Sequence, residues 1–265
     1  MTEEKSKARL DPLKLNINSE FKFNCHKDME CFTTCCRDIN IILTPYDIIR
    51  LKKRLDLPSD EFLGIYTEPQ LLEKTDLPVV TLKMLDTEDN SCPFVKKDGC
   101  IIYEDRPSTC RYYPLGTATI AHEKDVDDRQ GFYFFVNEPH CKGFSQDKKW
   151  TVKDWRIDQG VEKDDVINEG WNELIVMKRS YPPNMHFTEK AKELFFMVCY
   201  NLDKFKRFID ESQFIELHNI DKQTEDKIKT NEVELLKFGL KWLKWLMFKQ
   251  GDFTINKDMI NQRTK

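Results

Sequence analysis

The spacing of hydrophobic positions changes near residue 150 of the chain. Before that point, the stretches 78–85, 114–122 and 131–138 are rich in β-branched or aromatic residues and are bounded by turn formers. Each of them is typical of a strand. The charged segment 123–130 joins the second stretch to the third. This arrangement predicts an antiparallel hairpin.

Helical patterns lie on both sides of these strands. Thr44, Pro45 and Asp47 suit the N-cap, the first helical position and the first turn of a helix that runs to about Asp56. Ser59 is the expected cap of a second, short helix.

From Thr151 onward, apolar residues recur at helical spacing. Thr151 and Asp154 resemble a capping box. The pattern predicts helices over 152–159, 163–179, 189–210 and 225–250. Pro182 and Pro183 separate the helix that ends at residue 179 from the helix that begins at residue 189.

These elements predict an α+β fold in three parts. Residues 1–20 are polar and form a flexible N-terminal arm, and residues 21–145 form a cysteine-rich domain of short antiparallel strands and helices around a metal site. Residues 146–265 form a helical domain packed on it. The last helix is apolar around most of its circumference, which favours packing between helices over an amphipathic membrane surface carrying Trp242 and Trp245.

Composition excludes several classes of protein. Of the 265 residues, 40% are hydrophobic and 33% charged, so a core can form, and the net charge of −4 argues against nucleic-acid binding. No stretch has the roughly 18 consecutive apolar residues of a membrane span. The first ten residues lack the apolar core of a secretory signal, so we expect a cytoplasmic protein. A protein substrate or partner is expected to bind through the helical half.

The cysteines are concentrated in the first half of the chain. Eight of the nine lie between residues 25 and 141: Cys25, Cys31, Cys35, Cys36, Cys92, Cys100, Cys110 and Cys141. In a reducing compartment such crowding indicates metal ligation more often than four disulfides, which remain the minor alternative. Cys199 lies in a helical stretch among apolar neighbours and is expected to be a core residue.

The cysteine spacings argue against common metal motifs. The first group reads C-x5-C-x3-C-C and the second C-x7-C-x9-C, followed by Cys141. Only Cys31 and Cys35 have the close spacing of the cysteine pairs in structural zinc sites, so a zinc ribbon is weakly supported. The ferredoxin motif C-x2-C-x2-C is absent. A radical S-adenosylmethionine motif fails because its third position is Asp38.

Polar residues beside the cysteines are candidates for supporting roles. Arg37, Arg106 and Arg111 lie close to presumed ligands, where a guanidinium lowers the pKa of a thiol and offsets the charge of a metal–sulfur centre. His26 and His140 each adjoin a cysteine. A neighbouring residue often points away, so both are expected outside the ligand set.

Taken together, these residues resemble a known family. The pattern comprises Cys35-Cys36-Arg37, Leu43-Thr44-Pro45-Tyr46-Asp47-Ile48 and Arg50-Leu51, then Cys92-Pro93-Phe94, Gly99-Cys100, Tyr103, Arg106-Pro107, Cys110-Arg111 and Tyr113-Pro114. It resembles the YkgJ-type cysteine-cluster family of zinc- or iron-chelating domains, to which the flagellin lysine N-methylases look related. The resemblance covers about residues 20–145.

The resemblance implies an iron–sulfur cluster or zinc held by cysteine thiolates. It carries over directly to six cysteines: Cys35, Cys36, Cys92, Cys100, Cys110 and Cys141. Cys25 and Cys31 depart from the family's compact C-x2-C-x2-C-C spacing. Tyr103 and the arginines Arg37, Arg106 and Arg111 are expected around the ligands.

Two functions follow from these observations. The first is a metal-binding cysteine-cluster protein. The alternative, which the resemblance to the flagellin lysine N-methylases implies, is an S-adenosylmethionine-dependent protein lysine N-methyltransferase. The chain contains no G-x-G that would support a Rossmann-type cofactor loop.

The number of thiols favours iron–sulfur over zinc. One tetrahedral zinc uses four of the eight thiols, and iron–sulfur clusters accept wider ligand spacing. Adjacent side chains diverge in most backbone conformations, so we expect Cys35 and Cys36 to face different sites or one of them to face the core.

Overall fold

The computed structural model describes residues 9–10, 14–118, 132–182 and 184–256. It has the predicted α+β fold, with short antiparallel strands in the N-terminal part and helices throughout the C-terminal half. The chain divides into two compact units, each made of two stretches. Unit 1 is Met1–Leu43 with Thr81–Val166, and unit 2 is Thr44–Val80 with Ile167–Lys265. The continuous domains predicted from the sequence, with boundaries near 20 and 145, stay a prediction.

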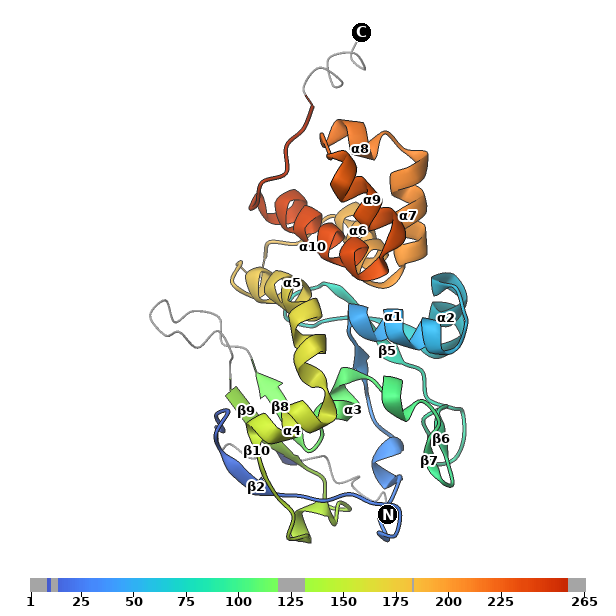
Figure 1. Cartoon of the computed structure of the whole chain (residues 1–265), viewed down its shortest axis with the longest axis vertical. Helices are drawn as coiled ribbons and strands as arrows, with labels where there is room; N and C mark the ends of the chain where they lie inside the picture. Colours follow the sequence, from blue (N-terminus) through green and yellow to red (C-terminus); the bar gives the residue numbers. More distant parts are fainter. Residues whose placement is uncertain (1–8, 11–13, 119–131, 183, 257–265) are drawn as a thin grey trace. The chain divides into compact units, whose positions relative to one another are not determined.

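A β-hairpin forms one side of unit 1 (Figure 1). Strands β8 (Leu115–Ala118) and β9 (Phe132–Asn137) pair antiparallel, as predicted, and β1 (Arg9–Leu10) pairs with the other edge of β9. The charged segment expected to connect β8 to β9 lies outside the described residues. Leu15 belongs to the stretch expected as an arm, yet it bridges to Tyr133 and is buried.

A second strand pair brings distant parts of unit 1 together. Strand β2 (Glu20–Lys22) pairs antiparallel with β10 (Lys149–Thr151), and neither strand was predicted. Between these two pairs lies an apolar cluster whose buried members are Leu15, Phe21, Phe23, Leu115, Tyr133, Val152 and Trp155. Phe23 is at its centre and makes edge-to-face contacts with Tyr113, Phe144 and Trp155. Aromatic burial of this kind is the main stabilising contribution in a small core.

Short elements carry the remaining part of unit 1. These are the 3-10 turns η1 (Thr34–Cys36), η2 (Tyr103–Asp105) and η3 (Gly143–Ser145), the strands β3 (Ile42–Leu43), β6 (Val95–Lys96) and β7 (Gly99–Cys100), and the helices α3 (Ser108–Tyr112) and α4 (Val152–Gln159). Helix α4 has the predicted bounds. Its N-terminus is capped by Thr151, whose hydroxyl accepts a hydrogen bond from the Asp154 amide.

Unit 2 begins with the helix that the sequence predicted from its cap. In α1 (Pro45–Arg54), the Thr44 hydroxyl accepts from the Asp47 amide and the Asp47 carboxylate accepts from the Thr44 amide, which completes a capping box. Helix α2 (Ser59–Tyr66) starts at Ser59, and Pro58 occupies the N-cap position expected for that serine. Strands β4 (Thr67–Leu71) and β5 (Pro78–Leu82) follow, and β4 was not predicted.

The other helices of unit 2 include two pairs that the periodicity predicted as single helices. Helix α5 (Val161–Arg179) begins in unit 1, and α6 (Glu189–Tyr200), α7 (Leu202–Glu211), α8 (Phe214–Leu217), α9 (Lys222–Thr230) and α10 (Glu232–Phe248) lie in unit 2. The helices predicted over 189–210 and 225–250 are each broken in two, at Asn201 and Asn231. Both asparagines leave helical geometry and cap the helix that follows, because their side chains accept from its first amides.

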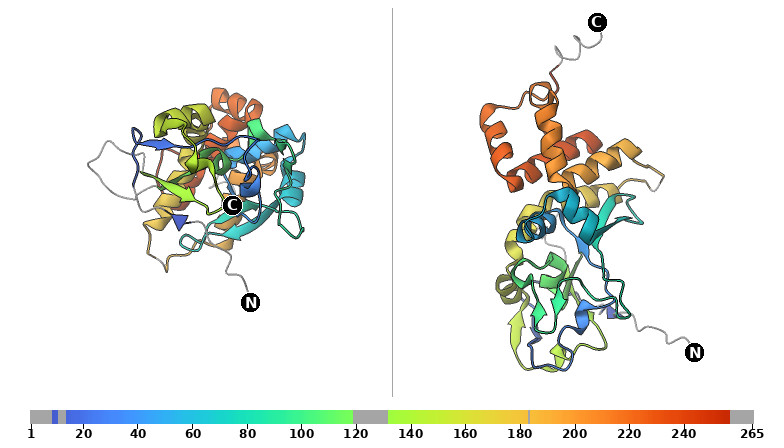
Figure 2. Two further views of the ribbon diagram at one scale, coloured as in Figure 1. Left: turned by 90° about the horizontal axis from the view of Figure 1, so that it is seen from below. Right: turned by 90° about the vertical axis from the view of Figure 1, so that its right-hand side faces the viewer.

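Helix α10 packs against α6, α7 and α9, as Figures 1 and 2 show in orange and red. Its buried face includes Leu236, Phe238 and Leu243, which agrees with the predicted packing role. No helix in the described part of the chain combines the length and apolar character needed to cross a membrane.

A buried lysine joins several elements of unit 2. The Lys52 ammonium lies 3.0 Å from a carboxylate oxygen of Asp203 and also contacts Glu232. The other oxygen of Asp203 accepts from the Ser59 amide at 2.7 Å. Burying this cation is tolerated because two carboxylates neutralise it.

We expect Gly239→Ala to destabilise unit 2 by about 1–3 kcal/mol, because its new Cβ overpacks the core. That Cβ would lie 2.6 Å from Val198 and 2.7 Å from Phe205. Gly64→Ala in α2 is the matched control, since nothing lies within 4 Å of its Cβ, and it should stabilise the helix by about 0.5–1 kcal/mol. Urea unfolding of both variants measures the difference. Equal effects would contradict the packing of α10 described above.

Candidate metal centre

The structure separates the eight clustered cysteines from the ninth. All eight lie in unit 1, whereas Cys199 lies in α6 of unit 2 and is fully buried. All nine are free thiols in this structure. The pKa of Cys199 lies well above that of an ordinary thiol because of its burial. It therefore behaves as the core residue that the sequence predicted.

The first cysteines follow β2 on a segment that is held against the chain after Cys141. The Phe23 amide donates to the Lys148 carbonyl at 2.9 Å, and the Asn24 amide donates to the Gly143 carbonyl at 3.1 Å. Gly143 is required here because a Cβ at this position would lie 2.3 Å from the Phe23 ring. Cys25 follows immediately and is the exposed member of the eight.

A direct contact joins Cys31 to the same region. The amide of Lys142 donates to the Cys31 sulfur at 3.3 Å. The pKa of the Cys25 thiol is raised to about 11. Partial desolvation is the largest cause, and the neighbouring thiols of Cys35, Cys141 and Cys31 add smaller effects. Four thiols from segments more than 100 residues apart are thus close enough to influence one another electrostatically.

Cys35 and Cys36 end the turn η1, and their side chains do not diverge as expected. The Cys35 thiol is hydrogen-bonded to that of Cys36, and this bond, then burial, raises the pKa of Cys35 far above its ordinary value. The tight 3-10 turn, entered through Thr33 in a left-handed conformation (φ 64°), keeps the two side chains together.

Three polar side chains that the sequence did not assign to the site lie beside Cys35 and Cys141. Burial is the main reason that the pKa of Tyr113 is raised, and the contact with Cys141 adds to it. The carboxylate of Glu138 also raises the pKa of both Tyr113 and Cys35. A carboxylate oxygen of Glu138 lies 3.3 Å from Nε2 of His140. Within the described residues, Tyr113 Oη, Glu138 Oε2 and His140 Nε2 are buried atoms that make no hydrogen bond of ordinary geometry. Glu138 and His140 are polar neighbours of one another, and the Cys141 thiol lies beside the Tyr113 hydroxyl.

Cys100 lies on β7 of the hairpin formed by β6 and β7, and Cys92 lies three residues before β6. The Cys92 amide donates to the Cys36 carbonyl at 2.8 Å, and Cys100 is paired with Val95 in the hairpin ladder. Burial, and then the Cys100 thiol, raises the pKa of Cys92. Burial also raises the pKa of Cys100, whereas the charge of Arg106 lowers it.

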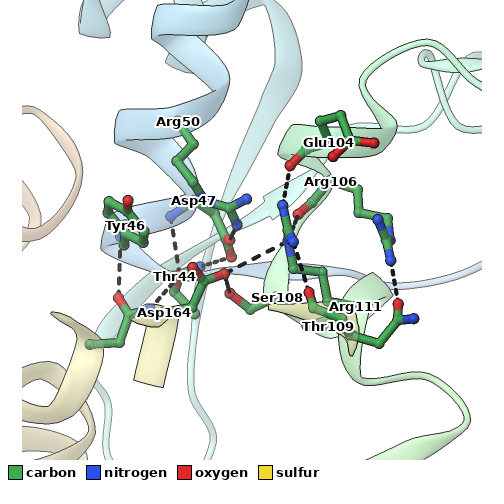
Figure 3. Close-up of polar contacts among 12 residues, drawn as sticks. Thr44, Tyr46, Asp47, Arg50, Glu104, Arg106, Ser108, Thr109, Arg111 and Asp164 are labelled. Carbon is green, nitrogen blue, oxygen red and sulfur yellow. Dashed lines mark hydrogen bonds and ion pairs between the residues drawn. The ribbon is translucent and has the colours of Figure 1, made fainter. Parts of the chain in front are cut away.

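Cys110 lies on α3, which is held in place by the next residue, Arg111 (Figure 3). The Arg111 guanidinium donates to the Arg106 carbonyl at 3.1 Å, to the Gln159 carbonyl at 2.8 Å and to the Glu104 carbonyl. It also lies 3.8 Å from the buried carboxylate of Asp164. A guanidinium suits this arrangement because its several N–H groups lie in one plane and can donate to several carbonyl groups at once.

The other predicted supporting residues are placed around the thiols by similar contacts. Arg106 stacks on the Tyr103 ring at 3.9 Å and donates to the Tyr103 carbonyl at 2.7 Å and to the Gln159 side chain. Arg37 forms an ion pair with Asp89, N to O 3.0 Å. Gln159 and Asp164 were missed in the sequence because helical spacing alone does not show which residue faces α3.

The thiol set fits a metal ion by its chemistry. Cysteine thiolates are ligands for zinc and for iron–sulfur clusters, and a metal replaces the protons that the raised pKa values retain. In this structure, no three Cys, His, Asp or Glu side chains of the described residues stand in a geometry that would hold an ion. The ligand set assigned from the sequence therefore stays a prediction.

A comparison with protein-family models identifies the cysteine-rich region. Residues 24–142 match the family CxxCxxCC, described as a "Putative zinc- or iron-chelating domain". We call residues 24–142 the CxxCxxCC domain. The match agrees with the resemblance seen in the sequence and supports metal binding by this domain in general. No curated protein and no solved structure matches the chain.

We expect Arg111→Gln to lower both the stability and the metal content of the CxxCxxCC domain. It leaves the carbonyl groups that now accept from Arg111 without this donor, at a cost of about 1–3 kcal/mol, and loosens the helix that carries Cys110. Arg179→Gln is the control, because Arg179 is exposed and such a change costs less than about 0.5 kcal/mol. Denaturant unfolding and metal analysis measure both effects. Unchanged metal content in a destabilised Arg111 variant would show that Arg111 does not position a ligand.

Proposed function

We propose that the CxxCxxCC domain binds an iron–sulfur cluster through cysteine thiolates. The match to a family described as a zinc- or iron-chelating domain supports binding of zinc or iron. The observation that favours iron–sulfur is the number of thiols gathered in unit 1 and the distance along the chain between them. Ligands of one cluster bind different irons of a large inorganic core, so they accept spacings that a single zinc ion does not.

The residues around the thiols are suited to hold such a group. Apolar side chains limit access of water, since Cys141 lies against the cluster that contains Phe23 and Leu115. Arg106 places positive charge beside Cys100, which offsets the negative charge of a thiolate-bound centre. When bound, an iron–sulfur cluster supplies one-electron redox chemistry or a structural link.

The methyltransferase alternative gains no support. Nothing among the described residues favours a site for S-adenosylmethionine, and metal binding is sufficient to explain the family match. A protein partner bound by the helical half remains a proposal that follows from the sequence.

We expect the protein isolated without oxygen to be brown and to contain iron and acid-labile sulfide. Serine variants of Cys92, Cys100 and Cys110 should each lose iron and unfold at lower denaturant concentration, because metal ligation and folding are coupled. Cys199→Ser is the matched control, since it removes a thiol from unit 2 and should leave the iron content unchanged. Visible absorption, iron and sulfide assays and urea unfolding measure these effects.

Two results would contradict the proposal in different ways. Stoichiometric zinc without iron after anaerobic isolation would overturn the choice of metal and leave the ligands standing. Loss of metal from a folded Cys199→Ser protein would overturn the placement of the site in unit 1.

A further inference from the structure

The chain that follows α10 turns back along unit 2. Residues 250–256 form neither helix nor strand, and we call them the strap. Left-handed conformations at Lys249 (φ 58°) and Gly251 (φ 111°) redirect the chain at the end of α10. Further along, the Asn256 amide donates to the Leu217 carbonyl of α8 at 2.8 Å. The strap is thus fastened to a helix that lies more than thirty residues earlier in the chain.

Phe253 anchors the middle of the strap on aromatic side chains. The centroid of its ring lies 5.3 Å from that of Phe238, 5.8 Å from that of His218 and 6.3 Å from that of Trp245. Contacts of this kind contribute packing energy beyond simple burial. In this position the strap covers aromatic residues of α8 and α10.

His218 lies among these rings, directly after α8, and is only 7% exposed. Its ring centroid is 4.6 Å from that of Phe214, 5.5 Å from that of Trp245 and 6.2 Å from that of Trp242. Nδ1 lies 3.2 Å from the carbonyl oxygen of Thr254 in the strap. A carbonyl oxygen can only accept, so Nδ1 carries the proton and Nε2 is the atom that a second proton would occupy.

The surroundings of His218 favour the neutral imidazole. Burial lowers its pKa, and the Thr254 carbonyl opposes this with a smaller effect. Within the described residues, no ion pair or hydrogen bond joins His218 to a charged side chain of the elements packed around it. The charged residues nearest in sequence on these elements are Glu216, Lys241, Lys244, Lys249 and Asp252.

We propose that residues 250–256 are a pH-sensitive strap, which neutral His218 holds closed over the aromatic residues of α8 and α10. An imidazolium at this position needs hydration that the closed strap excludes. An open strap hydrates the ring and exposes Phe238 and Trp245, an apolar surface of the kind with which other proteins associate.

The direction of the pH dependence follows from the burial of His218. The closed state binds the second proton less tightly than the open state, because the pKa of His218 is lowered only while the ring is buried. Closure is therefore fully stabilised above the ordinary pKa of histidine. This stabilisation is lost as the pH falls through the lowered pKa of the closed state.

A fluorine label at the anchor of the strap reports its position. Phe253 of the full-length protein is replaced by 4-fluorophenylalanine and followed by fluorine NMR from about pH 8 to about pH 5. In the closed strap, the rings of Phe238, Trp245 and His218 displace the resonance from its position in an unfolded chain. We expect the resonance to move toward that position as the pH falls, while circular dichroism shows that the helices stay folded.

Two histidine variants test whether His218 is the group that titrates. His218→Asn keeps a side-chain N–H that can donate to the Thr254 carbonyl and does not titrate, so its resonance should be the same at both ends of the pH range. His186→Asn is the matched control, because the His186 side chain is 66% exposed and its ring does not contact the strap. It should keep the response of the labelled wild-type protein.

A third variant weakens the strap without changing His218. Asn256→Pro removes the amide that donates to the Leu217 carbonyl. Closure is then less stable at every pH, so the resonance should move at a higher pH than in the wild-type protein.

Three results would overturn the proposal. The first is a resonance that stays in place throughout the pH range in which the wild-type protein is folded and His218 becomes protonated. The second is equal movement in the His218→Asn protein, which would assign the titration to another group. Should the wild-type protein unfold before its resonance moves, the Asn256→Pro protein decides, and a resonance that moves there only on unfolding is the third.

Discussion

Thiolates brought close together in a poorly hydrated environment repel one another, and this repulsion is the constraint on which unit 1 depends. Partial desolvation and the neighbouring thiols raise the pKa of Cys25, and the hydrogen bond with Cys36 contributes most to the raised pKa of Cys35. In the absence of a cation, a raised pKa favours the protonated, neutral form of the Cys25 and Cys35 thiols. A metal removes that penalty by replacing the protons, so ligand binding and stability of this unit are coupled.

The scaffold that holds the thiols consists largely of main-chain contacts between short segments. Turn η1, the β6–β7 hairpin and α3 are each too short to be stable alone. Phe23 and its aromatic neighbours anchor the segment leading to Cys25, while Arg111 fixes α3 by donating to three carbonyl groups. Small elements can thus position ligands accurately when one buried ring and one guanidinium satisfy many partners at once.

Sequence patterns predicted what depends on local interactions. The cap at Thr44, the bounds of α4 and the β8–β9 pair follow from residues close together in the chain, and all agree with the structure. The pairing of β2 with β10 places Phe21 opposite Trp150, which lies far along the chain, and no local pattern in either segment reveals it. The breaks at Asn201 and Asn231 were missed for a different reason. Apolar periodicity continues across each asparagine, while its side chain caps a new helix.

The candidate site shows the same division between local and tertiary information. The cysteines and arginines are visible in the sequence because their types and spacing are unusual. The roles of Glu138 and Tyr113 depend on β9 and the chain after it meeting the turn that carries Cys35, which is a tertiary relation. A similar argument applies to adjacent Cys35 and Cys36. Their position in the sequence suggests that they diverge, whereas the tight turn holds their thiols in contact and the surrounding chain gives each a different set of neighbours. Ligand identity can therefore be predicted from residue type, but the grouping of ligands follows only from the fold.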